Sequence, residues 1–112
     1  MEQFVNRLQD LYNRVPRRHS AENLQEINGV LDEYSGILGG IEALGPWYEK
    51  NTAVFYPSLE SIQQILKLSN SNKHAKKAKD ALFDEASGKL KDDIASLIAV
   101  YETGNKTTGD KS

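Results

Sequence analysis

Few residues of this chain are suited to acid–base, nucleophilic or metal chemistry, and they lie far apart. The two histidines, His19 and His74, have no third ligand at metal-like spacing nearby, so we expect both to be solvated. Asp92 and Asp93 are adjacent, and neighbouring residues of a helix diverge by about 100° around its axis. Their carboxyl groups therefore cannot converge on one substrate atom, and we interpret them as a solvated helix face.

The serines and glycines give no catalytic signal either. No serine has neighbours that form a nucleophile motif, and the glycine pairs do not make a phosphate-binding fingerprint. The absence of cysteine excludes disulfides, thiolate catalysis and thiolate-bound zinc. We predict a non-enzymatic protein with no catalytic residue, no metal site and no cofactor.

A lysine cluster is the strongest electrostatic feature of the sequence. It lies at the expected N-terminal end of the last helix, where each cation opposes the helix dipole by a few tenths of a kcal/mol. An acidic partner surface, anionic lipid headgroups or RNA would compensate, and Arg14, Arg17 and Arg18 would join the cluster if the helices fold back. The alternative is a solvated face whose lysines favour the helix and are balanced by Asp80, Asp84 and Glu85. The cluster consists of Lys73, Lys76, Lys77 and Lys79, with His74 among them.

Aromatic residues gather in the least regular part of the chain, residues 45–57. They either cap the end of a helical core or serve as anchors for a partner. We predict that they and the lysine cluster form a partner-binding site. These aromatic residues are Trp47, Tyr48, Phe55 and Tyr56.

The elements that must position these residues are helices. Apolar residues recur every three or four positions over residues 2–15, 24–44 and 58–68, and this spacing is typical of amphipathic helices. A longer stripe predicts a final helix of about 30 residues, longer than the average globular helix. Its members are Ala75, Ala78, Leu82, Ala86, Leu90, Ile94, Leu97 and Tyr101.

Local signals set the expected boundaries of these helices. Pro16 ends the first helix, and Ser20 is a candidate N-cap for the second. The second helix either bends at its glycine pair and ends before Gly45, or stops at that pair. Asn72 is the expected cap of the last helix and Gly104 its expected end. We predict one helical domain over residues 1–104 and a disordered tail over 105–112.

Composition restricts the class of protein. A chain of 112 residues with 38% hydrophobic and 27% charged residues suits a single folded domain. The formal net charge of -2 argues against nucleic acid as a partner, because phosphate neutralisation needs a basic excess. With no membrane span or secretory leader in the sequence, we expect a cytoplasmic protein.

Three segments in order resemble the N-terminal helical region of the seventy-kilodalton exocyst subunit, a vesicle-tethering protein. They are Glu22-Asn23-Leu24 with Val30-Leu31-Asp32-Glu33-Tyr34, then Tyr48-Glu49-Lys50, then Tyr56-Pro57-Ser58-Leu59-Glu60-Ser61-Ile62. The resemblance implies a role in exocytosis with a helical subunit or a small GTPase as partner. The lipid-binding positions of that family have no counterpart in this chain.

The expected architecture is all-α: an elongated antiparallel four-helix bundle, partly coiled-coil-like, with a long C-terminal helix. The expected function is a protein–protein interaction module, an exocyst-like segment that also makes weak contact with anionic membrane. Two alternatives stay open. One is a small cytosolic immunity-type four-helix protein, and the other is a secreted helical hairpin.

Overall fold

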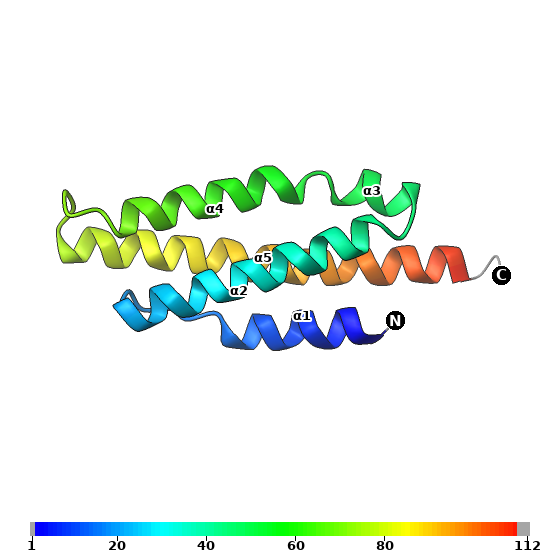
Figure 1. The fold of residues 1–112 in the computed structure, drawn as a ribbon, viewed down its shortest axis with the longest axis horizontal. Helices are drawn as coiled ribbons and strands as arrows, with labels where there is room; N and C mark the ends of the chain where they lie inside the picture. Colours follow the sequence, from blue (N-terminus) through cyan, green and yellow to red (C-terminus); the bar gives the residue numbers. More distant parts are fainter. Residues whose placement is uncertain (1, 110–112) are drawn as a thin grey trace.

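The computed structural model describes residues 2–109, and within that range every regular element is an α-helix. Four long helices form the predicted all-α bundle, and a short fifth helix occupies part of the segment expected to be irregular (Figure 1). The helices are α1 (Glu2–Arg14), α2 (Ala21–Glu42), α3 (Pro46–Thr52), α4 (Phe55–Ser69) and α5 (Lys76–Gly109).

The bundle is a rod measuring 55 × 22 × 17 Å. Successive long helices run in opposite directions, so that α1 and α4 point one way and α2 and α5 the other (Figure 1). The long helix α5 lies in the centre and packs against α1, α3 and α4, while α2 packs mainly on α1 and α3. The predicted elongated antiparallel bundle is therefore confirmed.

The boundaries of α1 and α2 follow the sequence signals. Helix α1 ends at Arg14, just before Pro16. The Ser20 side chain accepts a hydrogen bond of 3.0 Å from the Asn23 amide and caps α2. Helix α2 continues through the glycine pair to Glu42, as the first of the two expected alternatives proposed.

The boundaries of α4 and α5 differ from the expectation. Helix α4 begins at Phe55 rather than at Ser58, because Pro57 falls in its first turn, where a helix needs no amide donor. Helix α5 begins at Lys76, since the preceding turn is held by Ser71, whose hydroxyl accepts from the Lys73 amide, and not by Asn72.

The predicted end at Gly104 is wrong, because α5 continues through this glycine to Gly109. The expected disordered tail over 105–112 is thus helical up to Gly109, and positions 110–112 lie outside the described residues. Gly104 is buried inside the helix, where its small size serves packing and not termination.

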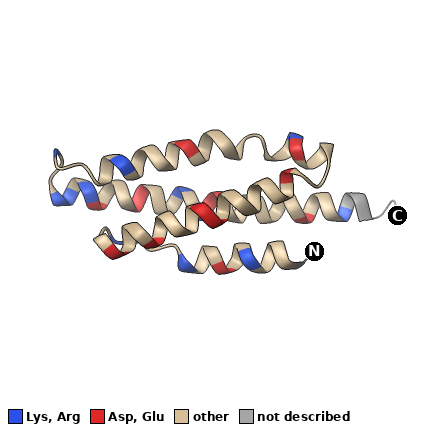
Figure 2. Ribbon diagram, viewed as in Figure 1, with Lys and Arg blue, Asp and Glu red and all other residues tan. Residues whose placement is uncertain are grey.

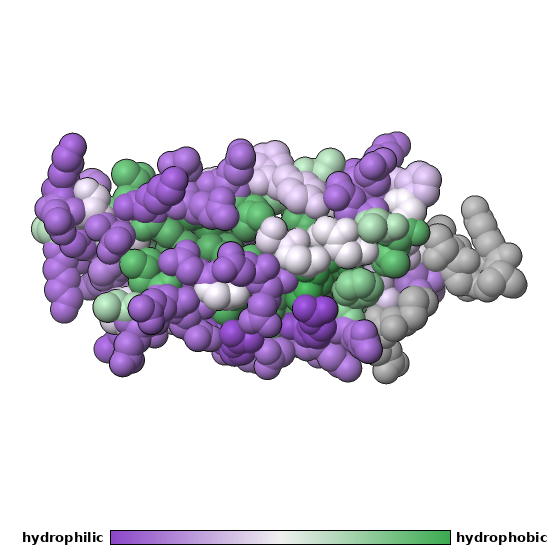
Figure 3. Space-filling model, viewed as in Figure 1, coloured by the Kyte–Doolittle hydropathy of each residue, from purple (hydrophilic) through white to green (hydrophobic). Residues whose placement is uncertain are grey.

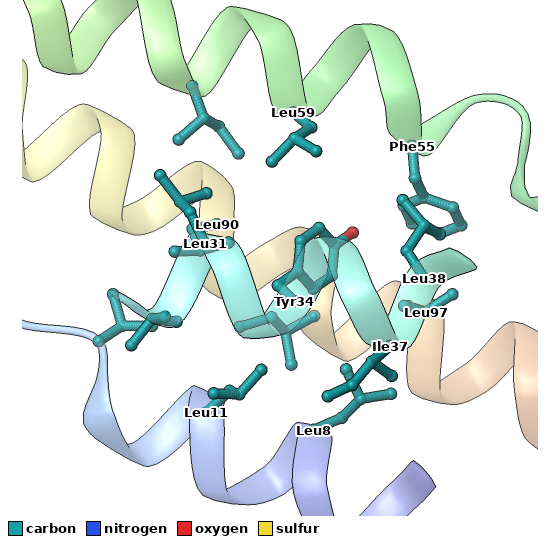
Figure 4. Close-up of a cluster of buried hydrophobic side chains, with 14 of the residues drawn as sticks. Leu8, Leu11, Leu31, Tyr34, Ile37, Leu38, Phe55, Leu59, Leu90 and Leu97 are labelled. Carbon is teal, nitrogen blue, oxygen red and sulfur yellow. The ribbon is translucent and has the colours of Figure 1, made fainter. Parts of the chain in front are cut away.

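All five helices contribute buried apolar side chains to one core, each worth about 1.5 to 3 kcal/mol (Figure 4). The stripe of α5 is confirmed from Ala86 to Tyr101, but its first part is shifted. Phe83 is fully buried, whereas Leu82 is half-buried and Ala75 precedes the helix. The Phe83 ring fills space beside His19, which the stripe of α5 alone could not reveal.

Candidate interaction surface

The four lysines of the predicted site lie together at one end of the rod. Lys73 is in the turn between α4 and α5, and the other three open α5 (Figure 2). Lys73, Lys76 and Lys77 are exposed, and Lys79 is half-buried. We call the set of Lys73, Lys76, Lys77 and Lys79 the lysine end.

No carboxylate of the described residues lies within ion-pair distance of these four lysines. Asp84, which was expected to balance them, pairs instead with Arg17 at 2.8 Å. The first turn of α5 contains no acidic residue. The lysine charges there oppose the helix dipole, and no carboxylate in the same turn offsets them. The lysine end is therefore a positive surface whose lysines form no ion pair with the described residues.

Two contacts hold the connection between α1 and α2 beside α5 at this end. Arg17 uses both Nε and Nη2 to donate to the same Asp84 oxygen, at 3.0 and 2.8 Å. The buried Ser87 hydroxyl donates to the Pro16 carbonyl at 2.6 Å. Arg17 is therefore held against α5 as expected for helices that fold back, but at Asp84, five residues after Lys79, where its charge is paired.

Arg14 does not join the lysine end. Its guanidinium lies on the opposite flank of α1, where it contacts Glu33 at 2.9 Å, Glu26 at 3.2 Å and Asp10 at 3.3 Å. The hydrogen bonds that Arg14 donates to Glu26, Glu33 and Asp10 hold its pKa above the ordinary value. Since α2 contains no lysine or arginine, this flank stays acidic.

The four predicted aromatic anchors are mostly part of the core. Tyr48 is 6% exposed and Phe55 is 5% exposed, so neither side chain presents a surface to a partner in this fold. Trp47 and Tyr56 are half-buried, and the Tyr56 hydroxyl donates to Glu42 at 2.9 Å. Their arrangement matches the alternative in which these rings cap the core.

An aromatic cluster closes the end of the rod at α3. The rings of Trp47 and Tyr48 meet edge to face at 5.4 Å, and Tyr101 lies 6.4 Å from Tyr48 and 5.3 Å from Phe4. This end is opposite the lysine end, so the fold does not bring the two halves of the predicted site together (Figures 1 and 2). The lysine end is the part of that site that faces solvent.

A polar group inside the bundle was not foreseen. The Ser58 hydroxyl donates to Asp93 at 2.5 Å, and the fully buried Tyr34 hydroxyl, which points toward α4, has no hydrogen-bond partner among the described residues (Figure 4). Burial raises the pKa of Asp93 and that of Tyr34, although the Ser58 hydrogen bond and Lys89 act against the rise at Asp93.

The expectation of a solvated pair at Asp92 and Asp93 is therefore wrong for Asp93, which is half-buried. Asp93 is three residues after Leu90 and four before Leu97. This spacing places it at the edge of the buried stripe, and it is the sequence signal that could have shown its burial.

His19 also differs from the expectation. Its ring packs edge to face on Phe83 at 5.7 Å, and its Nε2 is buried without a hydrogen-bond partner in the described part of the chain.

The described residues contain no group of three or more metal-ligating side chains, and none of their helices is long and apolar enough to cross a bilayer. Comparison with known proteins gives no further guidance: no family model, no curated protein and no solved structure matches this chain significantly.

Proposed function

We propose that this chain is a non-enzymatic helical module of the cytoplasm that binds an acidic surface of a protein partner through the lysine end. One observation carries the proposal: three lysines open α5 and a fourth precedes it in the turn, and none has a carboxylate partner among the described residues, although the helix dipole disfavours cations there. A chain selected for stability alone gains by placing acidic residues at this position. Carboxylates from a partner would neutralise the same charges on binding.

Charge of this kind acts mainly on recognition and on the rate of association. A concentrated positive patch attracts an acidic surface over a distance of about 8 to 10 Å at moderate ionic strength. The acidic flank around Arg14 repels that same surface, so the partner approaches the rod at one end. The helical subunit or small GTPase implied by the exocyst resemblance falls within this class, but no match supports that resemblance, and the proposal rests on the surface alone.

The test is a charge reversal at the lysine end with a matched reversal elsewhere. The variant Lys76→Glu with Lys77→Glu reverses two exposed charges at the start of α5. The control, Lys50→Glu with Lys106→Glu, reverses one exposed charge of α3 and one near the C-terminal end of α5. Partners captured by the wild-type chain are identified by mass spectrometry and purified, and their affinity is measured by titration at two salt concentrations.

We expect the first variant to bind the partner roughly tenfold more weakly at low salt, since each reversal replaces an attraction worth up to about 1 kcal/mol with a repulsion. The control should bind as the wild type does. The first variant should also keep the melting temperature or raise it slightly, because glutamate suits the N-terminus of a helix. Unchanged affinity of the first variant at low salt would show that the lysine end plays no part in binding.

A further inference from the structure

An open groove runs between α2 and α4 on one face of the rod. The backbones of these two helices make few close contacts with each other. Helix α4 packs mainly on α5, whereas α2 packs mainly on α1 and α3. They diverge toward the start of α2 (Figure 1), and the groove between them has a volume of about 800 Å³. Figure 3 shows apolar surface along this face between polar rims.

The floor of the groove is apolar and its walls are rich in amides. Buried Leu66 and half-buried Leu24 are the leucines that line it. Leu31, Leu59 and Leu90, which point toward one another in Figure 4, belong to the core and do not line the groove. Amide side chains from both helices line the walls, and an amide can either donate or accept a hydrogen bond. These residues are Asn28, Gln63, Gln64 and Asn70.

The groove also has electrical polarity along its length. Glu60 lines it near the start of α4, and Lys67 lines it in the last turn of α4. The end with Lys67 leads to the turn that carries Lys73, so it opens next to the lysine end. An occupant that is negative at the Lys67 end and neutral or positive at the Glu60 end therefore complements the groove.

We infer that this groove binds an amphipathic helix of the partner protein, with acidic residues toward the C-terminal end of that helix. The inference rests on the proposed function and states which part of the partner is bound. Helix α4 and its C-cap line the groove from Pro57 to Asn70, which at 1.5 Å per residue is about 20 Å and holds a helix of about 13 residues. The incoming helix lies parallel to α4, so that its dipole and its acidic residues face Lys67 and the lysine end.

The shape and chemistry of the groove favour a helix over a small molecule. Pockets for small molecules are enclosed and mostly apolar, whereas this groove is open along one face and its walls are mostly polar. A helix places apolar side chains on the floor at every third or fourth position while its polar flanks meet the amides. A ladder of leucines with acidic residues in the last two turns fits both features.

The probe is a fluorescently labelled synthetic helix of 16 residues, with leucines on one face and four glutamates in its last two turns. A second peptide carries lysines in place of those glutamates. Fluorescence anisotropy measures the binding of each peptide to the intact chain and to three variants. Ser61→Trp fills the groove, Lys67→Glu reverses its basic end, and Ser96→Trp places the same bulk on an exposed face of α5.

We expect the glutamate peptide to bind the wild-type chain and Ser96→Trp equally, and the lysine peptide to bind at least about tenfold more weakly. Ser61→Trp should lower the affinity by about tenfold or more, and Lys67→Glu by about fivefold. Circular dichroism checks that each variant is folded. Lys67 is exposed, so Lys67→Glu tests the groove even if the fold does not tolerate a tryptophan at position 61.

Equal binding to the wild-type chain and to folded Ser61→Trp and Lys67→Glu would overturn the inference, as would no binding at peptide concentrations up to about 1 mM. If Lys76→Glu with Lys77→Glu lowers the affinity for the purified partner while the groove variants do not, the proposed function stands. The groove is then not the binding site of that partner. A concentration-dependent dimer that Ser61→Trp abolishes would assign the groove to a second copy of this chain and would also overturn the inference.

Discussion

Gly104 lies so close to the indole ring of Trp47 that a Cβ atom at this position would come within 2.5 Å of the ring atom Cζ3. The same Cβ would lie 2.6 Å from Cε1 of Tyr48. A glycine inside a long helix lowers its stability by about 1 kcal/mol relative to alanine. At this position the loss permits the close approach of α3 to α5, and it allows the aromatic cluster to close the end of the bundle.

The substitution Gly104→Ala should therefore destabilise the protein although it raises helix propensity. We expect a loss of about 1 to 3 kcal/mol in the free energy of unfolding, because the aromatic rings must shift to admit a methyl group. The matched control is Gly88→Ala in the same helix, where nothing lies within 4 Å of the new Cβ. That control should gain about 0.5 to 1 kcal/mol. Urea unfolding followed by circular dichroism measures the free energy of unfolding of both variants. If both variants are more stable than the wild type, the close contact at Gly104 is contradicted.

The substitution Leu90→Ala tests the central position of α5 in the core. Leu90 is fully buried, so its truncation should lower the free energy of unfolding by about 2 to 5 kcal/mol through lost burial and a residual cavity. Leu68→Ala removes the same atoms from a side chain that is 49% exposed, and it should change stability by less than about 0.5 kcal/mol. Similar losses for the two variants in chemical denaturation would show that α5 is not packed as described.

The substitution Ser87→Ala tests the contact that holds the connection between α1 and α2 on α5. It leaves the Pro16 carbonyl without the Ser87 donor, and we expect a loss of about 1 to 3 kcal/mol in stability. Ser96→Ala on the exposed face of the same helix is the control and should be nearly neutral. Thermal unfolding by calorimetry compares them, and a neutral Ser87→Ala would mean that the hydrogen bond contributes nothing net.

Asp93 predicts a dependence of stability on pH. Burial raises its pKa in the folded state above the ordinary value of 3.8, so the folded protein binds the proton more tightly than the unfolded chain does. The contribution of this group to stability is then fully present below pH 3.8 and is lost as the pH rises through the folded-state pKa. At neutral pH the buried charge is a net cost.

The variant Asp93→Asn should accordingly be more stable than the wild-type chain at pH 7, and this advantage should shrink as the pH is lowered toward 4. The amide oxygen can still accept the hydrogen bond from Ser58. Asp32→Asn removes the same charge from an exposed position of α2 and should show no such trend. Melting temperatures across pH 4 to 8 give the comparison, and an advantage that grows as the pH falls would contradict the assigned direction.

The candidate site was predictable only in part. The residues of the lysine end are adjacent in the chain, so the sequence alone placed them on one short stretch of surface. The pairing of Asp84 with Arg17 is different, because it joins residues 67 positions apart and removes one of the acids that were expected to balance the lysines. The groove between α2 and α4 has no sequence signal at all, since it depends on how far two separate helices diverge.

Local periodicity and chain breakers determined the helices of this protein: Pro16 ends α1, Ser20 caps α2, and the stripe from Ala86 to Tyr101 faces the core. These features depend on neighbours within a few residues, and the sequence displays such neighbours directly. Only the tertiary structure decided that Gly104 lies under Trp47, that Asp93 is half-buried beside Ser58, and that the aromatic residues and the lysines lie at opposite ends of the rod. Such relationships arise from the packing of one helix on another, and local spacing does not encode the partner across that contact.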